Sequence, residues 1–353
     1  MFSISEIYSS RAKSDFSLSQ NETLASLNYM DYRQFKKVEL HRHFEACARL
    51  TSLAEMANMG LQEAATHFQI HHPMKSLEEV IQRFVRTVEY FRSYEVLERI
   101  AYEACEDAAL ENIRILELRY APSFIGAVQK LDFQKIHDAI LKGVQKAEKD
   151  FPIAVGFIGI IVRSQSMLEA EKSLDFFLHN KDSFLAIDLA DQEVGFDCRN
   201  FATLFSKARE HGLRVTCHSG EENVAEAPQF VKNAIDILGA ERIGHGLQII
   251  HDQNIMQYVK EKNIVLELCP TSNFLTNNWP DLASHPLKQL YEYGIACTIN
   301  SDDPVVFNID LSHEWKIAHE NMGIHLGAIH GMQETAYRAS FLPEAKKTAI
   351  WQS

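Results

Sequence analysis

The chain has 353 residues, of which 46% are hydrophobic and 24% are charged, and its formal net charge at pH 7 is −13. This is the composition of a globular protein with enough apolar material for a large core. The acidic balance argues against nucleic acid or an anionic membrane as a partner, because both require a basic face. A small neutral substrate is compatible with it.

The first 35 residues are polar and lack the apolar segment of a signal peptide, and no run of about eighteen apolar residues occurs in the chain. We therefore expect an N-terminal extension over residues 1–35, no membrane partner and a cytoplasmic location. The six cysteines form no C-x-x-C pair. Such scattered cysteines favour reduced thiols over a disulfide framework or a zinc ribbon.

Short apolar segments alternate with longer amphipathic ones, such as 77–91 and 133–147, whose apolar spacing of three to four residues predicts helices. The expected strands are 37–41, 113–120, 153–162, 184–190, 213–218, 242–246, 263–270 and 294–301. Strands alternating with helices pair in parallel, so these eight units predict a closed (β/α)8 TIM barrel. An open doubly wound sheet is the alternative, but it usually has a Gly-rich phosphate turn after its first strand, and none follows Leu40.

The connection between the first two expected strands is much longer than the others. Residues from about 48 to 110 are typical of several extra helices, which we interpret as a lid over the barrel mouth. No Gly/Ser-rich or Pro-rich linker divides the rest of the chain. We therefore predict a single barrel domain over residues 36–353.

The sequence V-E-L-H-R-H places His41 and His43 at the end of the first expected strand. Residues i and i+2 of a strand point to the same side, so both imidazoles can reach one metal ion. A polar surface pair is the commoner origin of an isolated H-x-H motif. On a strand of a buried barrel, however, an unpaired inward imidazole is costly, and a metal ion removes that cost.

Three further motifs end expected strands at the carboxyl face, where the active site of a parallel barrel lies. T-C-H-S-G-E contains His218 and Glu221, which are a candidate ligand and a candidate acid or base, or else part of a solvated loop. R-I-G-H-G holds His245 between glycines that permit close backbone approach, although a simple turn has the same pattern. N-S-D-D-P provides Asp302 and Asp303, one for a cation and one for the substrate, or a surface turn before the proline.

Together these motifs supply three histidines and one aspartate for a single divalent ion, with a glutamate and a further histidine nearby. Nitrogen and oxygen ligands suit zinc, and an open coordination position would hold water. Most of the remaining histidines are expected to be ordinary surface residues; they include His71, His72, His137, His179 and His319.

The chain resembles the adenosine deaminase family of the metal-dependent amidohydrolase superfamily. The resemblance rests on V-E-L-H-R-H, L-E-L-R-Y-A-P, I-D-L-A-x-x-E, H-S-G-E, R-I-G-H-G, C-P-T-S-N and N-S-D-D-P, which follow one another in the family's order from residue 37 to about 308. It implies one zinc ion per chain, with His41, His43, His218 and Asp302 as the ligands.

The resemblance also implies roles for the residues around that ion. Glu221 would donate a proton to purine N1, and His245 would orient the attacking water and help to deprotonate it. Asp303 would bond to purine N7, and Asp191 stands where the family offers a backbone N–H to N3. Phe84, in the lid, would exclude water.

The function implied is zinc-dependent hydrolytic deamination of adenosine or 2′-deoxyadenosine to inosine or deoxyinosine and ammonia, as in purine salvage. The partner implied is a small purine nucleoside. A hydrolase with two metal ions commonly needs a bridging lysine at the end of the fourth strand. F-L-A-I-D-L-A contains none, which favours a single ion.

Two departures from the family pattern leave the substrate open. Glu45 stands where the family has an aspartate that contacts the ribose 5′-OH, and Ala46 follows it in place of glycine. Asp191 replaces the glycine that faces N3, so its carboxylate is expected to point elsewhere. Deamination of adenine, or of a 5′-modified adenosine such as methylthioadenosine, is the alternative. A catalytically silent nucleoside-binding protein is the alternative outside enzymes.

Overall fold

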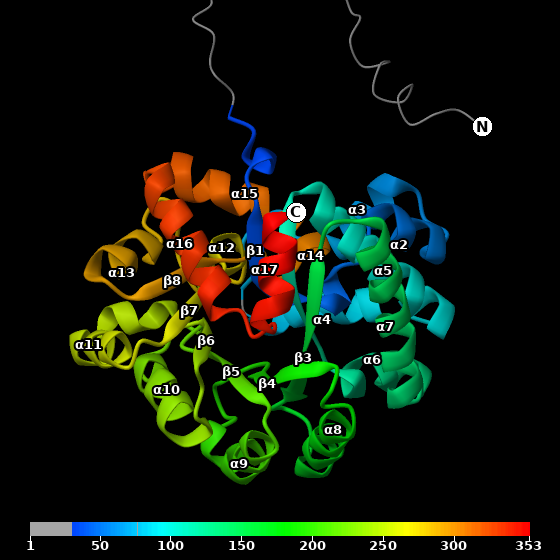
Figure 1. The fold of residues 1–353 in the computed structure, drawn as a ribbon, viewed down its shortest axis with the longest axis horizontal. Helices are drawn as coiled ribbons and strands as arrows, with labels where there is room; N and C mark the ends of the chain where they lie inside the picture. The colour runs from blue at the N-terminus through cyan, green and yellow to red at the C-terminus, as the bar shows by residue number, and fades with distance from the viewer. Residues whose placement is uncertain (1–29, 76) are drawn as a thin grey trace, which may run out of the picture. The chain divides into compact units, whose positions relative to one another are not determined.

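The computed structural model describes residues 30–75 and 77–353, and Figure 1 traces their path. Eight parallel strands lie side by side in chain order, each paired with the next. They are β1 Lys37–His43, β2 Ile113–Tyr120, β3 Ala154–Val162, β4 Phe184–Ala190, β5 Arg214–Ser219, β6 Arg242–His245, β7 Val265–Leu268 and β8 Ala296–Ile299. The predicted (β/α)8 barrel is confirmed, and the open sheet is excluded.

Helices fill the connections and surround the strands (Figure 1). Those before β5 are α2 Leu50–Ala57, α3 Leu61–Phe68, α4 Leu77–Val88, α5 Tyr94–Leu110, α6 Pro122–Gln129, α7 Phe133–Asp150, α8 Met167–His179 and α9 Ala202–Glu210. Those after it are α10 Ala227–Asn233, α11 Gln253–Glu261, α12 Pro270–Leu275, α13 Leu287–Tyr293, α14 Pro304–Phe307, α15 Leu311–Lys316, α16 Leu326–Ala339 and α17 Glu344–Gln352.

The seam between β8 and β1 is closed mainly at its carboxyl end. The backbone N–H of Asp302 donates to the carbonyl of His41 at 2.9 Å, and the N–H of His43 donates to the carbonyl of Asp302 at 3.0 Å. Lower on the seam, the Asn300 side chain accepts from the Leu40 N–H and donates to the Leu268 carbonyl. The closing bonds therefore tie predicted ligand positions on β1 and in the turn after β8 directly together.

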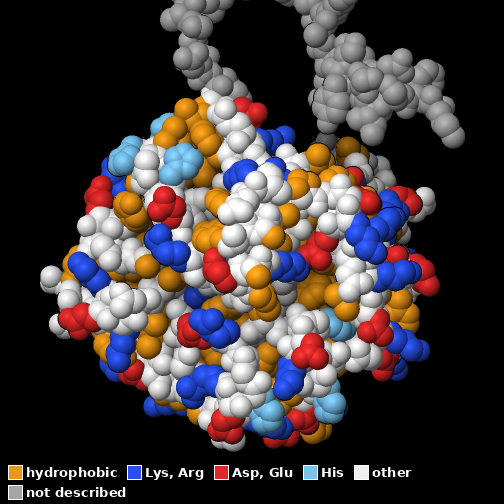
Figure 2. Space-filling model, viewed as in Figure 1, with side chains coloured by type: hydrophobic (Ala, Val, Ile, Leu, Met, Phe, Trp, Pro, Cys, Tyr) orange, Lys and Arg blue, Asp and Glu red, His pale blue; other side chains and the backbone are white. Residues whose placement is uncertain are grey.

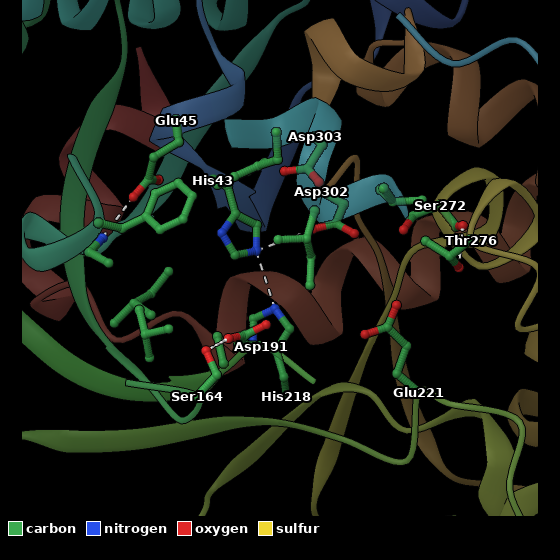
Figure 3. Close-up of a pocket in the computed structure, with 18 of the residues that line it drawn as sticks. His43, Glu45, Ser164, Asp191, His218, Glu221, Ser272, Thr276, Asp302 and Asp303 are labelled. Atoms are coloured by element: carbon green, nitrogen blue, oxygen red, sulfur yellow. Dashed lines mark hydrogen bonds and ion pairs between the residues drawn. The ribbon is translucent and has the colours of Figure 1, made fainter. Parts of the chain in front are cut away.

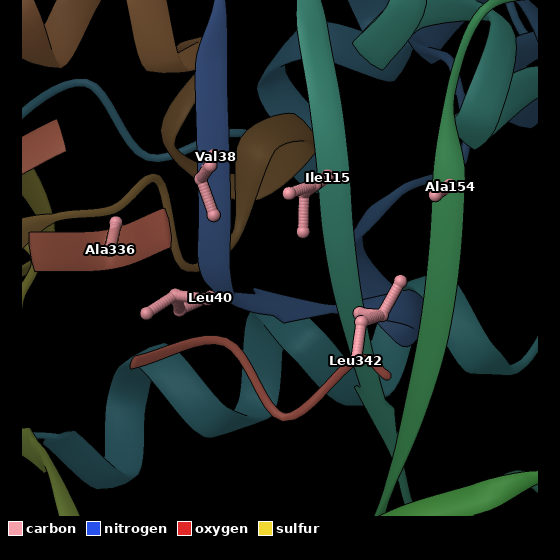
Figure 4. Close-up of a cluster of buried hydrophobic side chains, with 6 residues drawn as sticks. All are labelled: Val38, Leu40, Ile115, Ala154, Ala336 and Leu342. Atoms are coloured by element: carbon pink, nitrogen blue, oxygen red, sulfur yellow. The ribbon is translucent and has the colours of Figure 1, made fainter. Parts of the chain in front are cut away.

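Apolar side chains of β1 to β3 pack against the C-terminal part of the chain. Figure 4 shows this cluster, which joins three strands to α16 and the segment after it. Its buried members are Val38, Leu40, Ile115, Ala154, Ala336 and Leu342. Val38 pairs with Ile115, and the pairing of β1 with β2 is irregular between Glu39 and Arg42, so the side chains of β1 do not alternate strictly along its whole length.

The long first connection contains four helices, α2 to α5, and α4 contributes Val80, Ile81 and Phe84 to a pocket at the barrel mouth. The lid function of residues 48–110 stays a prediction. Tyr32–Ser353 form one compact unit. The predicted extension over residues 1–35 falls mostly outside the described residues.

Basic and acidic side chains are interspersed on the face drawn in Figure 2. All six cysteines are free and buried, as the absence of paired spacings predicted. Among the described residues, no helix is long and apolar enough to cross a membrane.

Candidate metal and active site

Four of the predicted site residues converge at the carboxyl end of the barrel. His41 and His43 come from β1, His218 from β5, and Asp302 from the turn after β8. One potential ligand atom from each lies within 4.8 Å of the others. The Nε2 atoms of His43 and His218 are 3.2 Å apart (Figure 3). The Asp302 Oδ1 atom lies 3.3 Å from the Nε2 atoms of both His41 and His43.

The hydrogen bonds of these residues leave lone pairs directed at one point. Nδ1 of His41 contacts Glu267 at 2.9 Å and Nδ1 of His218 contacts Asp188 at 2.9 Å, so each ring gives its N–H to a carboxylate. Their Nε2 atoms are then acceptors, and Nε2 of His41 is buried without a hydrogen-bond partner. Acceptors that converge with a carboxylate and no donor fit a bound cation.

A buried ionic network beneath the cluster holds these orienting carboxylates. Arg119 contacts Asp188 at 2.8 Å and Glu267 at 2.6 Å, and Arg242 contacts Glu267 at 2.6 Å. His218 and Arg119 outweigh the effect of burial and keep the pKa of the Asp188 carboxyl below its ordinary value. Both carboxylates are therefore ionised and able to hold imidazole N–H groups.

Backbone conformation at the strand ends is specific to the site. His245 and Asp302 have φ values of 61° and 60°, in the left-handed region that non-glycine residues seldom adopt. Gly244 lies against the His41 ring, and a Cβ there would be 2.8 Å from that ring. The absence of a side chain at Gly244 thus makes room for the imidazole of His41. Strained backbone conformations such as those of His245 and Asp302 are commonly found at functional sites.

Glu221 lies beside the ligand cluster in a dry environment. Its Oε2 atom is 3.5 Å from Nε2 of His245, and its Oε1 atom accepts from Nδ2 of Asn278 at 3.2 Å. Burial, reinforced by the charges of Asp302 and Glu193, raises the pKa of Glu221 well above its ordinary value. This shift favours the protonated, uncharged form of the side chain.

His245 has its ring orientation set from the side opposite the ligands. Its Nδ1 atom is 3.1 Å from Nδ2 of Asn273, whose amide oxygen is 3.1 Å from Nε2 of His285. The N–H of Leu287 donates to Nδ1 of His285, so His285 donates to the Asn273 oxygen and Asn273 donates to His245. Nε2 of His245 is left facing Glu221 and Asp302.

A pocket of about 290 Å³ opens from the ligand cluster towards α4 (Figure 3). Nine of the ten predicted site residues line it, all but His41, which lies in the ligand cluster behind it. Most of its remaining wall is apolar: Val80, Ile81, Ala121, Phe124, Ile160, Val162, Ala190 and Phe307. No lysine or arginine of the described chain lines it.

Two carboxyl groups in this pocket keep an oxygen without a partner. Glu45 accepts from the Ala121 N–H at 2.8 Å through Oε1, whereas its Oε2 has no hydrogen-bond partner. Asp303 likewise keeps a buried, unpartnered Oδ1. Burial raises the pKa of Glu45 to about 8 and that of Asp303 well above its ordinary value. Both are thus neutral groups able to donate to a ligand.

Asp191 occupies its predicted place at the pocket, with a φ of 88°. Glycine adopts this conformation freely, and aspartate tolerates it better than most residues. The carboxylate bonds to the Ser164 hydroxyl and accepts from the Gln192 N–H at 2.8 Å. Its oxygens are thus engaged by neighbours at the pocket edge, in line with the expectation that they do not face a purine.

Several residues of the site were not assigned from the sequence. The supporting groups Arg119, Glu267, Asn273 and Asn278 lie on β2, β7 and the segment after it, and their partners are distant in the chain. One expectation was wrong: His137 is buried between Tyr120 and Ser183, at 2.6 Å and 2.7 Å, rather than on the surface. Its position on the inner face of α7 explains the difference.

A parallel barrel with three histidines and an aspartate at its carboxyl end defines the class of metal-dependent hydrolases. The family model for adenosine deaminase matches residues 36–353. Adenosine deaminases from Klebsiella pneumoniae and Vibrio parahaemolyticus are 32% and 33% identical to the chain, over 89% and 88% of it and 96% and 95% of their own lengths. The chain therefore belongs to the adenosine deaminase family and is a hydrolytic deaminase.

Solved structures agree on the fold. An adenine deaminase from Arthrobacter aurescens aligns with a TM-score of 0.81 at 23% identity, over 90% of this chain and 97% of its own. A zinc-bound amidohydrolase from Burkholderia ambifaria aligns at 0.83 and 25%, over 91% and 90%. The N6-methyl-AMP deaminase of Arabidopsis thaliana aligns at 0.79 and 23%, over 91% and 96%.

Proposed function

We propose that the protein deaminates adenosine and 2′-deoxyadenosine to inosine and deoxyinosine with release of ammonia, using one zinc ion per chain. The ion would be held by His41, His43, His218 and Asp302. The observation that carries the proposal is the convergence of their buried lone pairs beside a protonated Glu221. A zinc ion held by these residues would lower the pKa of a bound water to about 7 and so would make hydroxide available at neutral pH.

In this proposal Glu221 supplies the proton that makes C6 of the purine reactive. Water adds to C6 while the Oε2–H bond breaks and an N1–H bond forms, so the ring electrons displaced by attack are neutralised as they develop. His245 orients the water. One proton of the water goes to the amino group, which leaves as ammonia, and the other passes from the C6 hydroxyl to the Glu221 carboxylate as the C6=O bond forms. Asp303, kept neutral by burial, donates a hydrogen bond to N7.

The pocket favours an uncharged substrate. Its lining contains no lysine or arginine, and Glu221, Asp191 and Glu45 add acidic groups instead. A phosphate would find no lysine or arginine there to pair with its charge. We therefore place nucleoside monophosphates outside the substrate range, although an aligned protein acts on N6-methyl-AMP.

Adenine is the second candidate substrate, because the unpartnered Oε2 of Glu45 need not meet a ribose. Initial rates on adenosine, 2′-deoxyadenosine, methylthioadenosine, adenine and AMP decide the order. We expect adenosine to have the highest kcat/KM and AMP to be inert. Turnover of adenosine no faster than that of adenine would overturn the proposed substrate, and elemental analysis with two metal ions per chain would overturn the stoichiometry.

A further inference from the structure

The carboxyl group of Glu221 has one side-chain neighbour on the segment between α12 and α13. Nδ2 of Asn278 lies 3.2 Å from Oε1 of Glu221 and 3.0 Å from Oγ1 of Thr276. Asn278 and Glu221 are each only 6% exposed. Leaving a buried side-chain amide without a hydrogen-bond partner costs free energy. The Asn278 amide is therefore expected to be oriented so that its nitrogen donates and its oxygen accepts.

Thr276 fixes the orientation of that amide. Its hydroxyl donates to the Ser272 carbonyl at 2.8 Å, so the Thr276 oxygen can only accept from Asn278. The Asn278 atom that faces Thr276 must therefore be the nitrogen. Since the same nitrogen faces Glu221, Oε1 of Glu221 is an acceptor as well, and its carboxyl proton belongs on Oε2.

Oε2 is the oxygen on the side of the ligand cluster, 3.5 Å from Nε2 of His245. We infer that Asn278 is a positioning residue that holds the Glu221 acid with its proton directed at the substrate. The inference rests on the proposed function, in which that proton goes to N1. When the Oε2–H bond breaks, the electron pair stays on the carboxylate, and the Asn278 N–H remains on Oε1.

This hydrogen bond strengthens during the reaction. A neutral carboxyl oxygen accepts less strongly than a carboxylate oxygen, because a charged partner makes a bond shorter and roughly twice as strong. Asn278 therefore stabilises the state in which Glu221 has given up its proton more than the resting state. Such differential stabilisation raises kcat and leaves substrate binding nearly unchanged.

The backbone of Glu221 is anchored independently of the Asn278 side chain. Its N–H donates to Glu193 at 3.2 Å, and its carbonyl accepts from Nε2 of Gln248 at 3.2 Å. Gln248 also donates to the backbone carbonyl of Asn278 at 2.9 Å, a contact that a substitution at Asn278 leaves in place. Loss of the Asn278 amide thus frees the carboxyl group alone.

The test uses the metal-loaded, full-length enzyme and compares Asn278→Leu, which keeps the volume, Asn278→Ala, and the neighbouring control Asn277→Gly. Asn277 is exposed with a φ of 62°, which glycine adopts without strain. We expect kcat for adenosine to fall about 10- to 100-fold in both Asn278 variants, with KM changed less than about threefold, and no change in the control.

A nucleoside in which C–H replaces N1 separates positioning from damage to the pocket. It has no atom to take the Glu221 proton, so its inhibition constant should be the same in the wild type and the Asn278 variants. Weaker inhibition that accompanies the loss of kcat would mean a distorted pocket and would overturn the inference. If Asn278→Leu fails to fold, Asn278→Ala carries both measurements.

Wild type and Glu221→Gln are measured in parallel to separate the two proposals. A wild type without purine deamination refutes the proposed function itself. A wild type that is active, a Glu221→Gln variant that is inactive and Asn278 variants that keep full kcat together refute only the positioning role.

Discussion

The ligand side and the substrate side of the pocket differ in how their polar groups are partnered. On the ligand side, the single side chain of Glu267 contacts four others, all of them buried: His41, Arg119, Arg242 and Thr216. On the substrate side, the walls are apolar and Glu45 keeps an oxygen without a partner. The polar groups of the ligand side are hydrogen-bonded within the protein, whereas the substrate side keeps polar atoms that have no partner in the protein.

This difference separates the type of reaction from the choice of substrate. Groups that must bind an ion and move a proton are preorganised by strands and by a charge network, so they need no rearrangement during the reaction. Groups that meet the variable part of a substrate sit on a helix and on loops, where sequence changes cost less stability. Substitutions on the ligand side should therefore change metal affinity and stability, and substitutions on the substrate side should change substrate preference.

The largest effect is expected from Glu221→Gln. Glutamine keeps the size of the side chain but has no acidic proton to transfer to N1, so kcat should fall about 100- to 10,000-fold. Metal content and the unfolding temperature should stay close to those of the wild type, because Glu221 is outside the ligand cluster. Glu226→Gln, at an exposed glutamate nearby, serves as the control. An active Glu221→Gln enzyme would contradict the assigned role.

Glu267→Gln should weaken the ligand side without touching the pocket. The change leaves His41 without its carboxylate and removes one partner from each of two buried arginines. We expect metal affinity to fall about 10- to 100-fold and the free energy of unfolding to fall by about 3 kcal/mol. Chelator competition and urea unfolding measure the two, with the exposed Glu292→Gln as control. Unchanged metal affinity would show that the network does not orient the ligand.

Glu45→Ala should alter the choice of substrate more than the reaction. Loss of a buried hydrogen bond is worth about 1.4 kcal/mol, so kcat/KM for adenosine should fall about tenfold, and that for adenine should change less. The rates on both substrates are compared with those of Glu45→Gln, which keeps an acceptor for the Ala121 N–H. An equal loss on adenine and adenosine would mean that Glu45 serves the reaction centre instead.

The last effect concerns acid stability, away from the pocket. Burial lowers the pKa of His137 to about 4. Below pH about 6.5 this imidazole is therefore protonated in the unfolded chain while it stays neutral in the folded chain. The stabilisation is complete above pH about 6.5 and is lost as the pH falls towards 4. In His137→Gln, the decline of unfolding free energy between pH 6.5 and 4 should be shallower by up to about 1.4 kcal/mol per pH unit. Urea titrations across this range measure it, and an unchanged slope would contradict it.

Strand periodicity and the barrel rule predicted that the polar residues at the strand ends meet at one end of the barrel, whereas the resemblance to the family assigned which of them are ligands. His41 and His43 share a strand face, and His218 and Asp302 follow other strands at the same barrel end, so local spacing plus one topological rule brings them together. The strand ranges were also close: 113–120 and 184–190 coincide with β2 and β4, while β7 is shorter than the expected 263–270. Adjacent loops account for the excess residues.

The partners of the site residues were not predictable in the same way. Glu267 lies 226 positions from His41, and Asn278 lies 57 positions from Glu221. The sequence position of a single glutamate or asparagine does not indicate which distant side chain it will contact in the folded protein. His137 failed for the same reason, since its burial depends on which face of α7 meets the barrel.

The sequence by itself determined the barrel, the family and the imidazole and carboxylate groups that can hold a cation, because these follow from periodicity, from the motifs and from residue chemistry at strand ends. Only the tertiary structure decided which nitrogen of each histidine faces the centre, which carboxyls are kept neutral, and which oxygen of Glu221 bears the proton. Those properties depend on burial and on hydrogen-bond direction, which arise when distant segments pack together.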